Sequence, residues 1–533
     1  MNAALSLANV RIGASFLWKL PFFLRHPISV EQARTALRER LERREVGFLV
    51  LARRTIYGNP RSPYLRLLAL AGCEYGDLER VVKQEGVEGA LRILYRHGVY
   101  LTVDEFKGRR PATRGNATVA VNPDLLRNPL AAYHVLARSG GSRSRGTPVL
   151  IDLAFVRGCG GNTCLVLEAR GGAEWLKAVW ATPGAGARFR LLELSSFGAP
   201  PVRWFSHVDP AAPGLDPIFR WSERAMRWGS GLAGVPLPHP LHIPLTDPLP
   251  IAHWMVDVLR AGRTPYLHTY PSSAVRLCQS AGDAGLDLHG AQFSLTGEPL
   301  TEARLAVIRR TGAEAAPRYG AMETGLIGYG CLTPETPDDL HLLHDLHALI
   351  ESPGPNALFI SSLHPAAPFI LLNVSMGDQA VVVERACGCP LERLGWVTHL
   401  HTIRSYEKLS GEGMTFLDTD VIRVLEDELP ARFGGAPTDY QLLEEEADDG
   451  QPRLRLLVHP RVDPLDTKAV AEAFFAAIGS GSPIARVMEV VWRDADLLRV
   501  ERRAPLITHA GKILHLHLGR ARGGPVLRRT PDP

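Results

Sequence analysis

The N-terminal quarter of the chain has apolar positions at intervals of three and four residues, the spacing of amphipathic helices. Residues 30–41 form one such stretch, and residues 64–70 form a second, which Gly72 ends. Residues 77–97 contain two more. We therefore predict that residues 1–130 are a helical N-terminal part of a larger domain.

The central part of the chain alternates short apolar runs with amphipathic segments, separated by turns rich in proline and glycine. This alternation is typical of an α/β sheet with helices on its faces. A strand-rich region follows, with predicted strands at residues 339–350, 358–362, 369–373 and 380–383 and a turn at 376–378. We take residues 131–404 as the core of the large domain.

Residues 405–533 form a smaller mixed region. Its predicted strands are 440–443, 453–458 and 486–491, and its predicted helices are 420–429 and 467–477. The predicted fold class is therefore α/β: a large N-terminal domain with mixed sheets flanked by helices, followed by a small α+β C-terminal domain.

Composition narrows the class of protein. The 533 residues are 45% hydrophobic and 22% charged, as expected of a soluble globular protein. The net charge of +4 comes from 60 basic and 56 acidic residues, and no dense basic block points to nucleic acid. The apolar patch at residues 16–24 is too short to span a bilayer and is interrupted by Lys19 and Pro21. We expect this patch to dock on the protein's own body, and we expect a cytoplasmic protein without a membrane span.

Residues 294–331 contain the first candidate chemistry. A strand ends in a turn at 297–299, a helix follows at 300–310, and a second strand ends near Tyr319 and Glu323. Turns at strand ends in α/β proteins are common ligand sites. Tyr319 offers a flat face for a purine, and Glu323 offers a carboxylate for a hard cation such as Mg²⁺. An ordinary βα unit is the alternative.

A second candidate is the glycine- and serine-rich loop at residues 139–148. Glycines let successive backbone N–H groups converge on an anion, and Arg143 and Arg145 add positive charge. No Gly-Lys-Ser/Thr follows, so the loop is not a Walker A motif. A plain surface loop remains the alternative. Lys512, which follows Gly511, would by itself be an ordinary turn residue.

The seven cysteines are scattered and odd in number, so a disulfide framework is not expected. Cys387 and Cys389 nevertheless form a close pair, and Cys331 and His341 lie upstream of it.

The order of these elements resembles the adenylate-forming superfamily, and within it the phenylacetate–CoA ligase branch. The sequence Thr269-Tyr270-Pro271-Ser272-Ser273 matches a segment of that branch, as does the cysteine and histidine pattern. The resemblance covers about residues 55–520 and is strongest from 269 to 389. It makes residues 131–404 the adenylation core and residues 405–533 a small mobile domain.

The resemblance implies a two-step reaction. A carboxylic acid attacks the α-phosphate of ATP, with Mg²⁺, to give an acyl-adenylate and pyrophosphate. A nucleophile then displaces AMP: coenzyme A, a cysteine of an acceptor protein, or a small molecule. A homodimer is compatible with this reading. The acid would lie against residues 228–270, whose apolar and aromatic character suits aryl or medium-chain acyl acids.

The resemblance also implies roles for single residues. Lys512 would be catalytic, and Glu323 would hold Mg²⁺. The matching phosphate loop comprises Ser139, Gly140, Gly141, Ser142, Arg143 and Gly146. The residues that would line the adenine pocket and the adjoining magnesium site are Gly297, Glu298, Pro299, Tyr319, Gly320, Ala321 and Met322. Asp378 and Arg404 would contact the ribose hydroxyls.

Cys331, His341, Cys387 and Cys389 match a zinc-type set found in part of the branch. Three thiolates and one imidazole suit tetrahedral Zn²⁺, and such a closed set is structural. His344 is a competing fourth ligand, and a reduced cluster without metal is the alternative.

Several positions depart from the family pattern. The phosphate loop has arginines and no lysine, Met322 stands where Ser or Thr is usual, and Ile403 replaces a glycine. Tyr406 and Glu407 replace the usual acidic hinge pair. A second reading from another class is therefore a non-catalytic relative that binds nucleotide or adenylate and serves as an assembly partner in a biosynthetic pathway.

Overall fold

The computed structural model describes residues 7–138, 148–181, 184–207, 209, 217–353, 357–405, 410–411, 414–415, 418–446, 452–479, 498–508 and 513–518. The chain divides between Ile403 and Arg404 into two compact units. The first unit holds a large mixed sheet and its helices, and the second holds a small sheet, so the predicted α/β fold class is confirmed.

The first unit begins with a run of helices, which cover the stretches predicted at residues 30–41, 64–70 and 77–97. They are α1 (Leu7–Arg25), α2 (Val30–Glu42), α3 (Arg44–Ala52), α4 (Pro63–Leu70), α5 (Tyr75–Arg96) and α6 (Val103–Phe106). Ser29 and Gln32 form a capping box that begins α2, and Gly72 adopts a left-handed φ of 64° just after α4. The two helices predicted within residues 77–97 are one element with a kink at Gly86, whose φ is 69°.

A sheet of 12 strands forms the centre of this unit, in the order β13-β14-β15-β16-β12-β11-β10-β9-β8-β5-β6-β7. The strands are β5 (Leu176–Ala181), β6 (Arg203–Ser206), β7 (Pro240–His242), β8 (Pro265–Thr269), β9 (Gln292–Thr296), β10 (Glu314–Ala321), β11 (Gly325–Gly330), β12 (Leu340–Leu342), β13 (His347–Glu351), β14 (Ala357–Ser362), β15 (Val374–Glu384) and β16 (Thr398–Ser405). From β7 to β10 neighbouring strands are parallel, whereas β10–β11, β11–β12, β12–β16, β13–β14 and β14–β15 are antiparallel.

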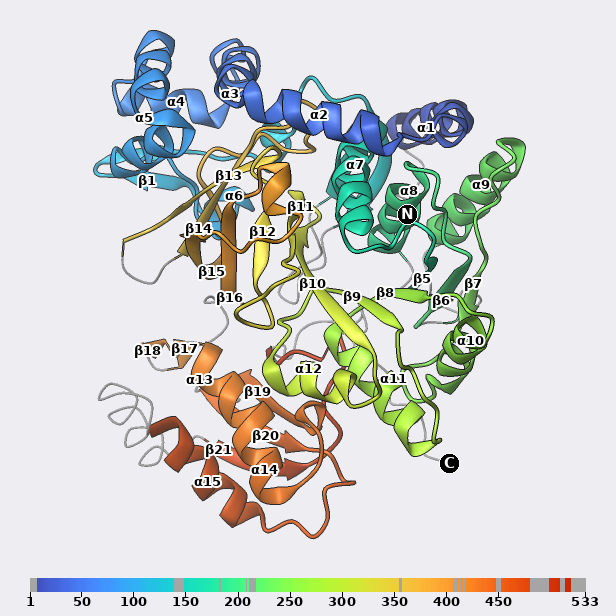
Figure 1. Ribbon diagram of the computed structural model, residues 1–533. Coiled ribbons are helices and arrows are strands. Elements are labelled where there is room, and N and C mark those ends of the chain that lie inside the picture. The colour runs from blue at the N-terminus through green and yellow to red at the C-terminus, as the bar shows by residue number, and fades with distance from the viewer. Residues whose placement is uncertain are drawn as a thin grey trace. The chain divides into compact units, whose positions relative to one another are not determined.

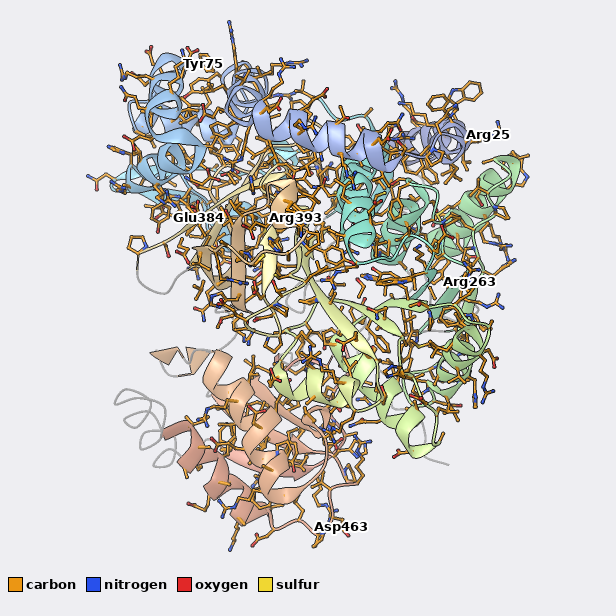
Figure 2. The ribbon with its side chains drawn as sticks, viewed as in Figure 1. Arg25, Tyr75, Arg263, Glu384, Arg393 and Asp463 are labelled. Atoms are coloured by element: carbon orange, nitrogen blue, oxygen red, sulfur yellow. The ribbon has the colours of Figure 1, made fainter. Side chains whose placement is uncertain are left out.

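Helices connect the parallel strands and cover them. They are α7 (Leu153–Ala169), α8 (Ala185–Ser195), α9 (Pro217–Leu232), α10 (Leu249–Arg260), α11 (Pro271–Asp283) and α12 (Glu302–Arg309). Two short pairs, β1 (Ala112–Arg114) with β2 (Ala117–Val119) and β3 (Tyr133–Arg138) with β4 (Pro148–Asp152), lie outside the large sheet. Side chains fill the space between these helices and the sheet (Figure 2).

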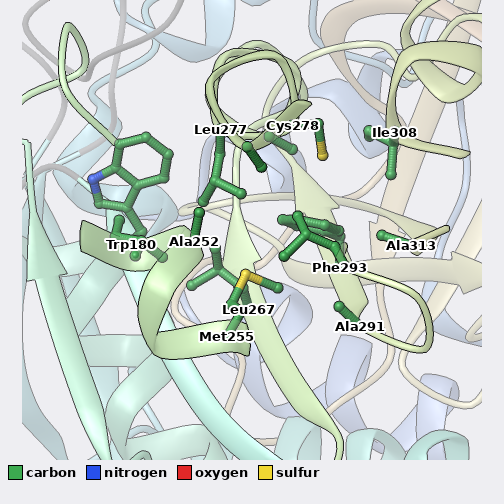
Figure 3. Close-up of a cluster of buried hydrophobic side chains, with 14 of the residues drawn as sticks. Trp180, Ala252, Met255, Leu267, Leu277, Cys278, Ala291, Phe293, Ile308 and Ala313 are labelled. Atoms are coloured by element: carbon green, nitrogen blue, oxygen red, sulfur yellow. The ribbon is translucent and has the colours of Figure 1, made fainter. Parts of the chain in front are cut away.

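The core of the parallel half lies between α10, α11 and the sheet (Figure 3). Trp180, Met255 and Leu267 meet there, with Leu277 and Phe293 beside them, and all five are buried. Burying such side chains contributes about 1.5–3 kcal/mol each, which fixes the parallel strands and hence the turns at their carboxyl ends.

The direction in which successive parallel strands are added to the sheet reverses between β5 and β8. The chain passes from β5 to β6 and β7 on one side, then from β8 to β9 and β10 on the other. In open α/β sheets, ligands bind outside the carboxyl ends of the strands at such a reversal. The turn at 297–299 follows β9, as predicted, so it lies at this edge.

Two strand predictions were wrong. Residues 339–350 form two short strands, β12 and β13, with a turn between them. The turn carries Asp345, whose buried carboxylate accepts hydrogen bonds from Arg40 at 2.8 Å and from Trp396 at 3.0 Å. Residues 369–373 lie outside the strands, because Asn373 has a φ of 50° and donates its side-chain amide to the carbonyls of Leu91 and Val99.

The turn predicted at residues 376–378 is also absent. These residues continue β15 as a bulge: the three residues of β14 from Ala357 to Phe359 face the five residues of β15 from Ser375 to Gln379. Gly377 takes a φ of 81° within the bulge. The bulge positions Asp378, because the added residues turn its side chain relative to the strand.

The second unit contains β19 (Tyr440–Glu446), β20 (Pro452–Val458), β21 (Leu498–Arg502) and β22 (Leu516–Leu518), in the order β21-β20-β19-β22. The helices α13 (Asp418–Arg423), α14 (Leu429–Phe433) and α15 (Thr467–Gly479) accompany the sheet, and β17 (Ser410–Gly411) pairs with β18 (Met414–Thr415). The strand predicted at 486–491 lies outside the described residues. Among the helices of the described residues, none combines the length and the apolar character needed to cross a membrane.

Candidate functional site

Glu323 lies in the turn between β10 and β11. The Thr324 hydroxyl closes this turn, since its oxygen accepts the Ala321 N–H at 3.1 Å and it donates to a nearby carbonyl. Gly325 follows with a φ of 72°, and a Cβ there would lie 2.6 Å from the Phe155 ring. The sequence Thr-Gly after Glu323 therefore fixes the carboxylate, of which only 5% is exposed.

Tyr319 and Asp378 meet across the sheet. The Tyr319 hydroxyl donates a hydrogen bond to the Asp378 carboxylate at 2.8 Å. Burial, and then the Asp378 charge, raise the pKa of Tyr319 well above its ordinary value, so the phenol keeps the proton that it donates. Two residues assigned to the nucleotide from the sequence are thus brought together from strands β10 and β15.

The Glu298 side chain has a structural role, because its hydrogen bonds go to residues of neighbouring helices. One carboxylate oxygen accepts the Ser272 N–H at 3.0 Å and Arg304 at 2.9 Å, and the other accepts the Ser272 hydroxyl at 2.8 Å. The side chains of Glu298 and Arg304 are each 1% exposed. This bridge ties the turn after β9 to the first turn of α11.

A buried charge network lies beneath the strand ends. Glu193 accepts hydrogen bonds from Arg190 at 2.7 Å, Arg318 at 2.8 Å and Thr163 at 2.5 Å, and Arg190 also donates to Tyr266 at 2.7 Å. Burial alone would raise the pKa of Glu193, but the two arginines outweigh it and hold the pKa at about 2. The network fixes Arg318, the residue before Tyr319.

Lys107, which the sequence reading missed, pairs with Glu323. Its ammonium group contacts the Glu323 carboxylate, and its side chain is 18% exposed. Lys107 caps the C-terminal end of α6, more than 200 residues before Glu323 in the sequence. A lysine in a polar, arginine-rich segment gives no sequence signal of such a contact.

Aromatic and hydroxyl side chains gather near the reversal point of the parallel strands. His207, which follows β6, lies 5.0 Å from the Trp180 ring and 5.7 Å from the Tyr270 ring. Burial lowers the pKa of His207 to about 3, so its ring is neutral at pH 7. The hydroxyls of Thr269 and Ser273 are buried and make no hydrogen bond within the described part of the chain. These groups are suited to line an acid-binding site, and of them Thr269 and Tyr270 fall within the range 228–270 predicted from the sequence.

Cysteines and histidines converge in the antiparallel half of the sheet. Ligand atoms of Cys331, His341, Cys387 and His399 all lie within 4.8 Å of one another. Cys389 belongs to the same cluster, because its sulfur lies 3.2 Å from Nε2 of His341, while the Cys387 sulfur lies 3.7 Å from that atom. We call these five residues the thiol–imidazole cluster.

The surroundings of the thiol–imidazole cluster suit a metal ion. Nδ1 of His341 lies 2.6 Å from the Trp396 carbonyl, an arrangement that directs the Nε2 lone pair at the sulfurs. Sulfur and nitrogen ligands of one tetrahedral zinc ion lie about 3.5 Å apart, close to the distances seen here. Glu392 accepts the Cys387 N–H at 2.8 Å and holds the Cys387–Cys389 turn. The residues therefore fit a metal.

His399, and not His344, joins this cluster. Nδ1 of His399 lies 2.7 Å from the Asp339 carboxylate, and its Nε2 is buried without a hydrogen-bond partner among the described residues. The sequence reading missed His399 because its position in β16 looks like ordinary strand alternation. Burial raises the pKa of Cys387 to about 12 and lowers the pKa of His341 to about 4.

Some predicted site residues are not described. Ser139, Gly140, Gly141, Ser142, Arg143, Gly146 and Lys512 lie outside the described residues, as do Tyr406 and Glu407. Arg404 lies in β16, where the second unit begins. The phosphate-loop and catalytic-lysine assignments therefore remain predictions.

No protein-family model and no curated protein sequence matches the chain. Solved structures do show similarity. A 2-hydroxyisobutyryl-CoA ligase in complex with 2-HIB-AMP and CoA is 14% identical, with 96% of this chain and 93% of that chain covered and a TM-score of 0.47. The anthranilate CoA ligase AuaEII with anthranoyl-AMP is 12% identical over 85% and 79%, with a TM-score of 0.42. An O-succinylbenzoate CoA synthetase of Bacillus subtilis with ATP and magnesium is 12% identical over 64% and 63%, with a TM-score of 0.37.

Proposed function

We propose that this chain is an AMP-forming ligase that activates a carboxylic acid, aryl or acyl, as its adenylate and transfers the acyl group to a nucleophile. The observation that carries the proposal is the hydrogen bond between Tyr319 and Asp378, together with the position of Glu323 in the turn that directly follows β10. Tyr319 lies near the end of β10, Glu323 lies in the turn that follows it, and Asp378 lies in the β15 bulge. The order of motifs along the sequence predicts that these three residues contact the nucleotide or its metal ion.

The described residues would bind and orient the nucleotide. The Asp378 carboxylate would accept the ribose hydroxyls while the Tyr319 hydroxyl holds it in place. The Tyr319 ring would lie against the adenine, and the backbone of the 297–299 turn, held by the sealed Glu298–Arg304 bridge, would form the edge of the base site. Binding ATP in one orientation brings the α-phosphate to the acid.

Charge develops on the α-phosphate as the carboxylate attacks, and preorganised positive groups stabilise it. A Mg²⁺ ion, when bound, supplies part of this charge as a Lewis acid, and Glu323 is the residue that would hold it. Lys512 would supply a second positive group, bridging the carboxylate and the phosphate. Pyrophosphate would leave in this step, and the adenylate would then react with coenzyme A, with the cysteine of an acceptor protein, or with a small nucleophile, with AMP as the leaving group.

The thiol–imidazole cluster would hold a structural Zn²⁺ ion. Cys331, His341, Cys387 and Cys389 make a closed set of three thiolates and one imidazole. His399, with its buried Nε2 and its Asp339 partner, is the other imidazole within reach. Because the set would be closed, we assign the metal to the fold and not to the reaction.

Two residues near Glu323 favour a second function, in which the chain binds a nucleotide or an acyl-adenylate without catalysis. Met322 stands beside Glu323 where a hydroxyl is usual, and Lys107 already neutralises Glu323. A chain with these features would bind nucleotide or an acyl-adenylate and act as an assembly partner. Catalytic turnover distinguishes the two functions.

Acid-dependent ATP–pyrophosphate exchange, combined with ATP binding, tests the proposal. Lys512→Ala is expected to abolish exchange while ATP still binds, because the lysine would act only after binding. Lys468→Ala, in the first turn of α15, is the matched control in the same unit. Exchange by Lys512→Ala at the wild-type rate would remove this lysine from the mechanism.

A further inference from the structure

The two glutamates at neighbouring strand ends are paired with different cations. Glu298 after β9 is bonded to Arg304, and both side chains are sealed at 1% exposure. Glu323 after β10 is paired with Lys107, whose side chain is 18% exposed. An arginine holds a carboxylate through a planar fork, whereas a lysine is a hydrated point charge on a flexible stem. The Glu298 pair is therefore sealed from solvent on both sides, whereas the lysine of the Glu323 pair is partly exposed.

The backbone that carries Lys107 is firmly held. Thr102 and Glu105 form a capping box that begins α6, and Glu105 also pairs with Arg114 at 2.8 Å. The Leu101 backbone is hydrogen-bonded on both sides, to the Asn373 carbonyl and the Ser375 N–H, each at 2.9 Å. The lysine is thus anchored next to the start of β15, the strand that carries Asp378.

The next residues also fix the direction of the lysine. The Phe106 ring packs on Phe369 with 5.5 Å between the ring centres, and Nζ of Lys107 lies 5.5 Å from the Phe106 ring. Gly108 turns the chain with a φ of 68°, and a Cβ there would lie 2.8 Å from Pro123. A polar turn on a surface needs no such anchoring. The packing around residues 106–108 therefore holds the Lys107 side chain opposite the Glu323 carboxylate.

A buried carboxylate needs a positive partner, and at Glu323 the chain supplies one. We propose that Lys107 is the resident cation of Glu323 and competes with divalent metal ions for its carboxylate. A metal ion binds at Glu323 only after the ammonium group has left. This inference rests on the proposed function, since the proposed function is what makes Glu323 a metal site. Lys107 is then a residue that sets the metal requirement of the protein.

The test measures Mn²⁺ binding to the full chain, without nucleotide or acid, by the electron paramagnetic resonance signal of free Mn²⁺. Lys107→Met is expected to bind Mn²⁺ at least about tenfold more tightly than the wild type, because a competing charge is gone. Lys83→Met is the matched control: Lys83 forms an exposed pair with Glu79 at 3.4 Å, and its loss leaves Mn²⁺ binding unchanged. Adding Glu323→Gln to Lys107→Met is expected to remove the gain.

Equal Mn²⁺ affinity of the wild type and Lys107→Met overturns the inference, and so does a gain that survives Glu323→Gln. Thermal melting gives an independent reading: Mn²⁺ is expected to raise the melting temperature of Lys107→Met more than that of the wild type. If Lys107→Met does not fold, Lys107→Arg decides the question. Its fork holds the carboxylate more firmly, so Mn²⁺ affinity is expected to fall, and a rise would contradict competition.

Pyrophosphate exchange on the same preparations separates this inference from the proposed function. Exchange by the wild type, together with unchanged Mn²⁺ affinity in Lys107→Met, refutes only the role of Lys107. A tenfold gain in Mn²⁺ affinity in a protein that exchanges with no acid refutes only the ligase activity.

Discussion

The two halves of the large sheet hold their buried polar groups in different ways. In the parallel half, the Glu193 carboxylate is the shared countercharge of Arg190 and Arg318, and Glu298 is sealed by Arg304. In the antiparallel half, the thiol–imidazole cluster brings five donor side chains together, and one of its buried atoms, Nε2 of His399, has no hydrogen-bond partner among the described residues. The charged groups of the parallel half have partners within the chain, whereas the donors of the cluster are arranged so that they could hold a metal ion.

The largest effect is expected from breaking the balance of the parallel half. Glu193→Gln would leave Arg190 and Arg318 buried without a countercharge, which costs about 3–5 kcal/mol of unfolding free energy. Urea denaturation measures the loss. Glu314→Gln removes an exposed partner of Arg309 and is expected to change stability by less than about 0.5 kcal/mol. A Glu193→Gln protein as stable as this control would show that the network is dispensable.

A smaller effect is expected from removing the zinc ion proposed for the antiparallel half. Treating the protein with a strong chelator, or changing Cys387 to Ser, is expected to lower the melting temperature by roughly 5–10 °C, equivalent to a few kcal/mol. Cys278→Ser, which changes a buried cysteine of the parallel core, should lower stability without changing the zinc content. Metal analysis of the purified wild type should give close to one zinc per chain. Zinc far below that level would leave the cluster as reduced thiols.

The proposed nucleotide site draws on both halves, since Tyr319 is on β10 and Asp378 is on β15. Asp378→Ala is expected to weaken ATP binding by about 10–100-fold, or 1.4–2.7 kcal/mol, because two ribose hydroxyls lose their acceptor. Tyr319→Phe removes one hydrogen bond and should weaken binding less. Isothermal calorimetry measures both. An unaltered ATP dissociation constant for Asp378→Ala would show that the ribose assignment is wrong.

The smallest expected effect is the pH dependence of the stability that Glu193 gives to the parallel half of the sheet. The pKa of Glu193 is about 2 in the folded chain and about 4.5 when unfolded, so this group stabilises the fold fully above pH 4.5. That stabilisation is lost as the pH falls from 4.5 toward 2, and from pH 5 to pH 4 the loss amounts to about 0.7 kcal/mol. The difference in unfolding free energy between the wild type and Glu193→Gln should shrink accordingly. A constant difference would contradict the assigned pKa.

The sequence predicted the elements whose pattern is local. The helices of residues 30–41 and 64–70 have clear apolar faces and end signals, and both were found. The strand, turn and helix of residues 294–310 were also found, because glycine and helical spacing mark them directly. The alternation of strands and helices was enough to predict the α/β sheet architecture, but it did not predict the order of the strands.

The errors arose where distant residues decide the structure. Residues 339–350 alternate like one strand, but Asp345 turns inward to Arg40 and Trp396, which no local pattern reveals. Asn373 takes a left-handed conformation because the carbonyls of Leu91 and Val99 accept its amide. The same reason explains why Lys107 and His399 were missed, because each acts through a partner far away in the sequence.

Acid-dependent exchange of labelled pyrophosphate into ATP, screened over aromatic, aliphatic and amino acids, tests the proposed ligase most directly. The proposal predicts exchange with at least one class of acid, dependent on a divalent cation and lost in Lys512→Ala. ATP binding without exchange for any acid would contradict it and would make the chain a binding protein.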